Sequence, residues 1–68
     1  MNWFAERRLE WIEETVRIFG FIRIAHIQRK FEISRPQASN DLAEFQRRRP
    51  GRIVYDKSAK QYVATRED

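Results

Sequence analysis

Ser34-Arg35-Pro36-Gln37 is the strongest local signal in the chain. The Ser34 hydroxyl can accept a hydrogen bond from the Gln37 amide, and the Gln37 side chain can return to the Ser34 amide, which is the pairing of a capping box. Pro36 lies in the first turn, where its missing N–H costs nothing. The segment therefore predicts a helix over residues 35–48.

The predicted helix over residues 35–48 has an apolar face and a polar face. Its buried stripe follows helical spacing and consists of Ala38, Leu42 and Phe45. The opposite face carries Pro36, Asn40, Ala43 and Arg47, with Gln37 and Glu44 at its flank. Pro50-Gly51 then ends the helix.

Upstream of Ser34 the pattern predicts two more helices. The first covers residues 2–19, and its inward stripe consists of Ala5, Leu9, Ile12, Val16 and Phe19. Gly20 can close this helix in a left-handed conformation, and a short extended segment follows at residues 21–22. The second helix is shorter, with an apolar stripe made of Ile24, Ile27 and Phe31.

Downstream of Gly51 the sequence becomes rich in β-formers. Two runs, residues 52–55 and 60–64, are separated by Asp56-Lys57-Ser58-Ala59, which predicts a hairpin with a four-residue loop. The whole order predicts an α+β, mainly α, winged helix-turn-helix: three helices followed by a two-stranded β-hairpin wing. We expect one such domain over residues 1–68.

The composition excludes several classes of function. The chain has no Cys and one His, which excludes disulfides and thiolate metal sites and predicts no metal site. It lacks paired carboxylates, a Ser–His pair and a Gly-rich phosphate loop, so we expect no catalytic residues, no cofactor and no small-molecule substrate. With no bilayer-spanning apolar run and no secretion signal, we expect a cytoplasmic domain without membrane contact.

Positive charge is concentrated in the second part of the chain. Residues 1–22 hold three basic and four acidic side chains, whereas residues 23–68 hold eleven basic and six acidic ones. A basic patch on a folded domain favours a polyanion, because each neutralised phosphate releases counterions. The alternative is a solvated face that keeps a small protein soluble.

The polar face of the third helix and the wing predict contacts with double-stranded DNA. Gln37 and Asn40 can pair with adenine, Arg35 can read guanine or hold a phosphate, and the remaining basic residues suit phosphates. The predicted DNA-binding residues are Arg35, Pro36, Gln37, Ser39, Asn40, Arg47, Arg48, Arg52, Lys57 and Lys60. A winged helix that serves only as a protein-interaction or dimerisation module is the alternative.

Other residues have structural interpretations. Gln37 also suits a purely capping role, and Glu44 suits an ion pair with Arg47 or Arg48 better than contact with cytosine. Because His26 lies outside the apolar stripe of its helix, we expect it to be exposed.

The first helix carries a second apolar stripe. Phe4, Trp11 and Ile18 recur every seven residues on a side away from Leu9, and Trp3 adds to them. We expect this stripe to contact a second copy of the chain or a further part of the same protein. The alternative is that the wing or the N-terminal residues fold over it.

From Arg8 to Thr65 the chain resembles the N-terminal winged helix-turn-helix of bacterial WYL-domain transcription regulators, the type that controls phage-defence loci and DNA-damage responses. The resemblance lies in residues 8–13, Gly20, residues 31–34, residues 36–42, Pro50 and residues 53–63. Residues 23–25 depart from the family, whose members tend to have a capping Asn or Ser there.

The resemblance implies sequence-specific binding of promoter DNA by a homodimer, with residues 34–40 in the major groove. A dimer favours an inverted repeat as its operator. The resemblance also implies a longer regulator, with a WYL effector domain and a C-terminal extension, from which this domain is excised.

Overall fold

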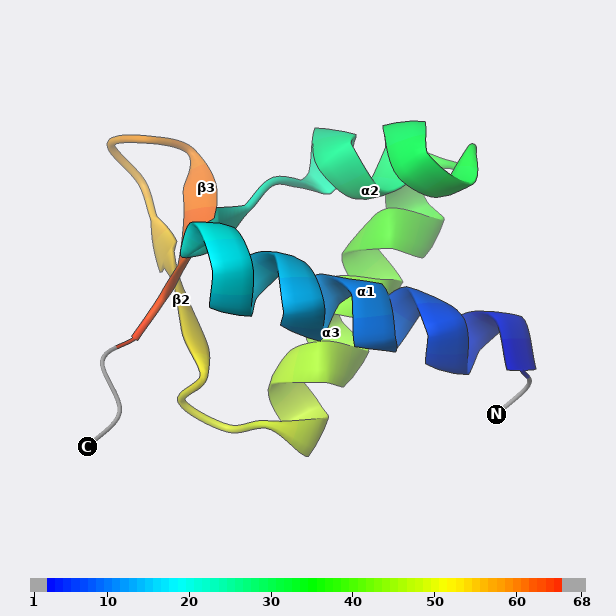
Figure 1. Cartoon of the computed structure of the whole chain (residues 1–68). Coiled ribbons are helices and arrows are strands. Elements are labelled where there is room, and N and C mark those ends of the chain that lie inside the picture. Colours follow the sequence, from blue (N-terminus) through cyan, green and yellow to red (C-terminus); the bar gives the residue numbers. More distant parts are fainter. Residues whose placement is uncertain (1–2, 66–68) are drawn as a thin grey trace.

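A computed structural model of the chain describes residues 3–65. The elements follow the order α1 (Trp3–Phe19), β1 (Phe21–Ile22), α2 (Ile24–Phe31), α3 (Arg35–Arg48), β2 (Ile53–Asp56) and β3 (Gln61–Ala64) (Figure 1). The predicted fold class, a mainly α winged helix-turn-helix, is confirmed. The predicted start of the first helix at Asn2 lies outside the described residues.

Helix α3 begins and ends where the local signals predict. The Ser34 hydroxyl accepts from the Gln37 backbone N–H at 3.2 Å, and the Arg49 N–H closes the last turn on the Phe45 carbonyl at 2.9 Å. One part of the predicted capping box is wrong. The Gln37 side chain does not return to Ser34, because its Nε2 donates to Oδ1 of Asp41 at 3.1 Å.

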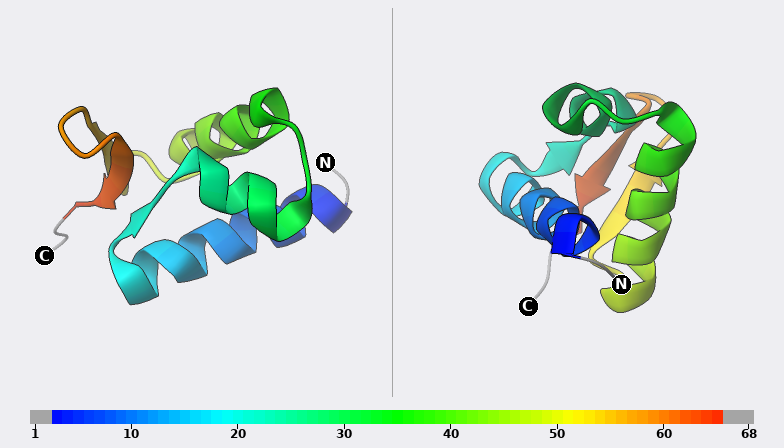
Figure 2. Two further views of the ribbon diagram at one scale, coloured as in Figure 1. Left: turned by 90° about the horizontal axis from the view of Figure 1, so that it is seen from above. Right: turned by 90° about the vertical axis from the view of Figure 1, so that its right-hand side faces the viewer.

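The core lies where the three helices and the sheet meet. Its buried apolar residues are Leu9, Ile12, Val16, Ile22, Ile27, Ala38, Leu42, Phe45 and Ile53. These residues include the three predicted for the inner face of α3. Figure 2 (right) views α1 nearly end on, with α2 above it and α3 beside it. The core therefore locks α3 against α1 and α2 and leaves the opposite side of α3 to solvent.

The prediction that Phe19 belongs to the inward stripe of the first helix is wrong, since 68% of the Phe19 surface is exposed. The chain turns immediately afterwards at Gly20, whose φ of 83° is the left-handed conformation that glycine adopts without strain. Ile22 of β1 then fills the core at this end, with 0% exposed. Phe19 consequently lies outside the packed interior.

The wing is part of a three-stranded antiparallel sheet with the order β1-β3-β2. Strand β2 begins and ends one residue later than predicted, and β3 begins one residue later but ends at Ala64 as predicted, since Asp56 pairs with Gln61 across the hairpin. The physical reason is the Asp56 side chain, whose Oδ1 accepts from the amides of Ser58 at 3.0 Å and Ala59 at 3.3 Å. Residues 57–60 therefore form the loop.

Candidate nucleic-acid interface

The N-terminal end of α3 presents short polar side chains to solvent. Arg35, Pro36, Ser39 and Asn40 are exposed, and Gln37 is half-buried at the flank. The Ser34 hydroxyl caps the helix by accepting from the Gln37 backbone N–H, and the cap does not cover these exposed side chains. The helix dipole favours negative charge at such an end, although Pro36 has no N–H and the Gln37 N–H is already bonded to Ser34.

The wing places two lysines on the same side of the domain as α3. Lys57 and Lys60 are exposed at the two ends of the β2–β3 loop. Figure 2 (left) shows that this loop and α3 both lie on the side opposite α1. The structure thus combines a polar helix end and a basic loop on one face.

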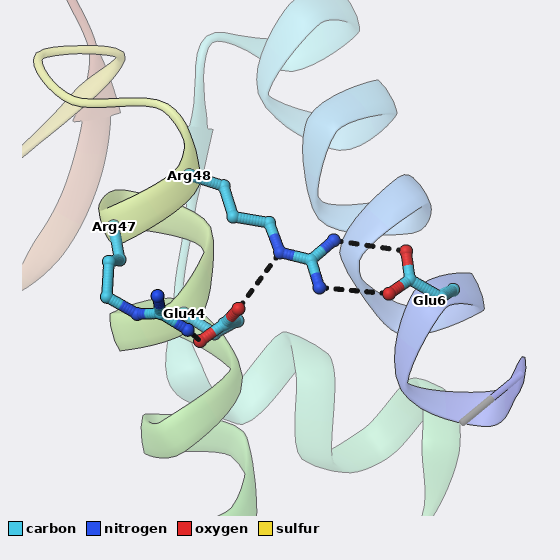
Figure 3. Close-up of polar contacts among 4 residues, drawn as sticks. All are labelled: Glu6, Glu44, Arg47 and Arg48. Atoms are coloured by element: carbon cyan, nitrogen blue, oxygen red, sulfur yellow. Dashed lines mark hydrogen bonds and ion pairs between the residues drawn. The ribbon is translucent and has the colours of Figure 1, made fainter. Parts of the chain in front are cut away.

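The C-terminal end of α3 carries arginines that are already paired (Figure 3). The Arg48 guanidinium donates to both Glu6 oxygens, at 2.9 and 3.1 Å, and its Nε donates to Glu44 at 2.9 Å. Arg47 binds the other oxygen of Glu44. Glu44 is therefore the ion-pair partner that the sequence predicted, and Arg48 links α3 to α1.

The electrostatics of this end follow from those hydrogen bonds. The Arg48 hydrogen bond lowers the pKa of Glu6, and hydrogen bonds from Arg47 and then Arg48 lower the pKa of Glu44. The Glu6 and Glu44 carboxylates in turn raise the pKa of Arg48 above its ordinary value. All three groups stay charged near neutral pH, so the positive charge of Arg48 is largely compensated within the domain.

Arg52, predicted to contact DNA from the wing, also has a carboxylate partner. Its Nη2 lies 3.4 Å from Oε2 of Glu13 in α1, and only 20% of the Arg52 side chain is exposed. The other oxygen of Glu13, Oε1, is buried without a hydrogen-bond partner among the residues from 3 to 65. Arg52 thus holds the start of the wing against α1.

A buried ion pair that the sequence reasoning missed joins α1 to the middle of α3. Arg8 Nε donates to Asp41 Oδ2 at 2.6 Å and Nη2 donates to Oδ1 at 3.3 Å. The side chains of Arg8 and Asp41 are only 15% and 6% exposed. Helical spacing contained the signal, because Asp41 falls beside the stripe formed by Ala38 and Phe45.

His26 is half-buried, which corrects the prediction that it is exposed. Its Nδ1 accepts from the Arg23 backbone N–H at 3.4 Å, and its ring centroid lies 5.9 Å from that of Phe21. Burial lowers the pKa of His26, and the charges of Arg23 and Arg29 lower it further. The His26 side chain, at the third position of α2, therefore satisfies the backbone N–H of the N-cap residue Arg23.

The predicted partner surface on α1 is not continuous. Trp3 and Phe4 are each 67% exposed and Ile18 is 62% exposed. Trp11 is half-buried, because its ring packs edge to face against Phe31 of α2 at a centroid distance of 5.5 Å. Within residues 3–65, Phe31 of α2 therefore covers part of the middle of the stripe.

Two further findings concern the part of the chain that the structure describes. No helix between residues 3 and 65 is long and apolar enough to cross a membrane. Within the same range, no group of three His, Asp or Glu side chains is placed to hold a metal ion.

The fold and this face define a class, the winged helix-turn-helix domains of transcription regulators. Residues 5–67 match the family described as the BrxR transcriptional regulator winged helix-turn-helix domain, and the chain belongs to this family. The chain is thus a regulator domain and not an enzyme. The family type that the motifs predicted is confirmed.

Individual relatives carry the name DNA-binding transcriptional repressor CapW. The protein from Escherichia coli strain KTE188 is 41% identical over 65 residues, which cover 96% of this chain and 22% of that protein. The Pseudomonas aeruginosa protein is 40% identical over 64 residues, covering 94% and 21%, respectively. The Stenotrophomonas maltophilia protein is 36% identical over 67 residues, covering 98% and 22%. The chain therefore spans about a fifth of the length of these relatives.

Proposed function

We propose that this domain binds double-stranded operator DNA for a bacterial transcriptional repressor. The N-terminal end of α3 enters the major groove, and the β2–β3 loop lies on the adjacent backbone or minor groove. The observation that carries the proposal is the capped, solvent-facing N-terminal end of α3, which exposes the short polar residues Ser39 and Asn40 beside Arg35. The names of the CapW relatives support the same function.

Base reading is assigned to the first turns of α3. Asn40 is exposed on the face opposite the buried stripe, and its amide can pair with both N6 and N7 of adenine. Arg35 suits guanine or a phosphate, and Ser39 suits a phosphate. Pro36 contributes apolar contact on the same face.

Backbone contacts are assigned to basic residues on the solvent-facing side of α3 and of the wing. Lys57 and Lys60 are exposed, and 73% of the Arg47 side chain is exposed despite its pairing with Glu44. Arg48 and Arg52, which the sequence also suggested, are left out of the proposal because their guanidinium groups bind Glu6, Glu44 and Glu13.

The test begins with selection of duplexes from a random pool, which reports specificity, symmetry and spacing together. Binding of the selected duplex is then followed by fluorescence anisotropy at several salt concentrations. With four or five phosphates contacted, the slope of log affinity against log salt should be roughly −4 per monomer. A slope near zero, or a pool without an enriched sequence, would favour the protein-interaction module instead.

We also propose that the regulator acts as a homodimer on an inverted repeat, in the cytoplasm where chromosomal DNA lies. The exposed apolar residues Trp3, Phe4 and Ile18, with the uncovered part of Trp11, form the proposed partner surface. Sedimentation should show that Phe4→Ser weakens self-association without loss of helix content. Trp11→Ala is a poorer test, because it also removes the contact with Phe31. A sedimentation coefficient independent of concentration contradicts this interface.

A further inference from the structure

The Asp41 carboxylate binds both a neighbouring helix and the flank of the proposed reading face. It accepts from Arg8 of α1 through Nε at 2.6 Å and Nη2 at 3.3 Å. It also accepts from the side-chain Nε2 of Gln37, one turn earlier in α3, at 3.1 Å. Only 5% of Asp41 is exposed, so water competes little for these bonds.

The chemistry of these groups determines which way the Gln37 amide faces. A carboxylate paired with a guanidinium only accepts hydrogen bonds, so the amide group facing Asp41 must be the NH₂. Rotating the amide by 180° would bring its oxygen against Oδ1 of Asp41, and two acceptors would then face each other. Asp41 therefore selects one of the two amide orientations of Gln37.

The rest of the Gln37 side chain is available for contact. Its backbone N–H alone satisfies the cap on Ser34 at 3.2 Å, so the side chain has no capping role. Gln37 is half-buried and lies beside the face that carries Pro36 and Asn40. Among residues 3–65, the amide oxygen and the second hydrogen of Nε2 take part in no hydrogen bond, and the orientation chosen by Asp41 directs the oxygen away from the carboxylate.

We propose that Asp41, held by Arg8, is a positioning residue that makes the base contacted by Gln37 a base with a major-groove amino group. The proposal rests on the proposed DNA binding. Adenine offers its amino group to the amide oxygen and its N7 to the second Nε2 hydrogen, and cytosine offers its amino group alone. Guanine and thymine present acceptors there, which the outward oxygen opposes. The expected order is adenine, then cytosine, then guanine and thymine.

The experiment compares four duplexes that differ only at the base pair read by Gln37. That pair is identified as the one whose preference disappears in Gln37→Ala. In the unmodified chain, adenine should bind about tenfold or more tightly than guanine, as expected for a paired amide contact. The positioning variant combines Arg8→Met with Asp41→Leu, because replacing both members of a buried ion pair with apolar groups preserves folding in favourable cases.

The double variant should keep the helical circular dichroism spectrum and the salt slope of the unmodified chain, while the adenine preference falls below about threefold. Asp41→Asn is the second variant, because an Asn side chain can donate as well as accept and so permits both orientations of the Gln37 amide. It should also lower the adenine preference. Glu6→Gln is the matched control, since it breaks a different contact between α1 and α3 and should keep the full preference.

Two results would overturn the proposal. One is an adenine preference that persists in both folded Asp41 variants although Gln37→Ala abolishes it. The other is a Gln37→Ala variant with unchanged preference at every position, in a chain that still binds its selected duplex. Failure of the proposed function is distinguishable, because the unmodified chain would then show no salt-dependent binding to any duplex.

Discussion

The two ends of α3 differ in what their polar residues do. At the N-terminal end, Arg35, Ser39 and Asn40 are exposed beside a helix cap. At the C-terminal end, Arg47 and Arg48 share the Glu44 carboxylate, and Arg48 also binds Glu6. The sequence places two arginines, Arg47 and Arg48, at the C-terminal end and one, Arg35, at the N-terminal end. The number of arginines overstates the positive charge at the C-terminal end, because Glu6 and Glu44 compensate the charge of Arg48.

The helix dipole acts in the same direction as the ion pairs. The N-terminal end of a helix attracts anions, whereas the C-terminal end favours cations of the protein itself. Arg48, which binds both Glu6 and Glu44, is therefore suited to stabilising α3, and the N-terminal end is suited to a phosphate or a base edge. The buried Arg8–Asp41 pair lies between the two ends.

The largest effect is expected from Asp41→Ala. This substitution leaves the Arg8 guanidinium without its carboxylate partner, and only 15% of the Arg8 side chain is exposed to water. It should therefore lower the free energy of unfolding by about 3–5 kcal/mol. Urea denaturation followed by circular dichroism measures the loss. Glu44→Ala at the C-terminal end is the control, and its loss should be much smaller because its arginine partners lie at the surface. Equal losses would contradict the difference between a buried pair and exposed pairs.

The next effect concerns specific binding. Asn40→Ala should weaken binding to the selected duplex by about 1–3 kcal/mol and leave binding to random duplexes almost unchanged, because it removes a base contact. Fluorescence anisotropy with both duplexes gives the ratio. Arg48→Ala at the other end should not change that ratio. If Arg48→Ala lowers specificity as much as Asn40→Ala, the assignment of reading to the N-terminal end is wrong.

A smaller effect is expected on the salt dependence of binding, which should differ between the exposed Lys57 and the paired Arg48. Lys57→Ala should reduce the steepness of the salt dependence by about 1, because it removes one phosphate contact, and should weaken specific and random binding alike. Arg48→Ala should leave the slope nearly unchanged, because Glu6 and Glu44 already compensate its charge. Affinity measured at five salt concentrations tests both variants. The same reduction in both would show that Arg48 also reaches a phosphate.

The smallest effect is a pH dependence confined to the C-terminal end of α3. The pKa values of Glu6 and Glu44 are lower in the folded chain than the ordinary value of 4.5, because both accept hydrogen bonds from arginine. Their contribution to stability is therefore present above pH 4.5 and lost as the pH falls through the lower folded values. Urea denaturation at several acid pH values should show this decline, and combining Glu6→Gln with Glu44→Gln should flatten it. An unchanged decline in that variant would assign it to other carboxylates.

Local signals account for most of the fold. Ser34 and Pro36 start α3, Pro50-Gly51 prevents its continuation, and the spacing of Ala38, Leu42 and Phe45 identifies its buried face. These features act between residues close in the chain, so they are readable without the tertiary structure. The exposed positions of Asn40 and Lys57 follow from the same reasoning.

The pair of Glu44 with Arg47 and Arg48 was readable in this way, but side-chain partners on different helices were not. Arg48 binds Glu6, which lies 42 positions away in the sequence, and Arg8 binds Asp41, which lies 33 positions away. The sequence contains many arginines and carboxylates that satisfy the same charge rule, and only the packing of α1 on α3 selects the pairs. For this reason Arg48 and Arg52 were predicted as DNA contacts, although the structure pairs both with α1.

The three helices, the wing and the polar N-terminal end of α3 follow from local sequence, because caps, turn residues and apolar periodicity act over a few residues. Helix packing is needed to tell which cations remain available and which way the Gln37 amide faces, because both depend on carboxylates brought in from another helix or another turn. The net charge counted from a sequence includes every arginine. The charge that a ligand meets also depends on which carboxylates lie within hydrogen-bond distance of each arginine in the fold.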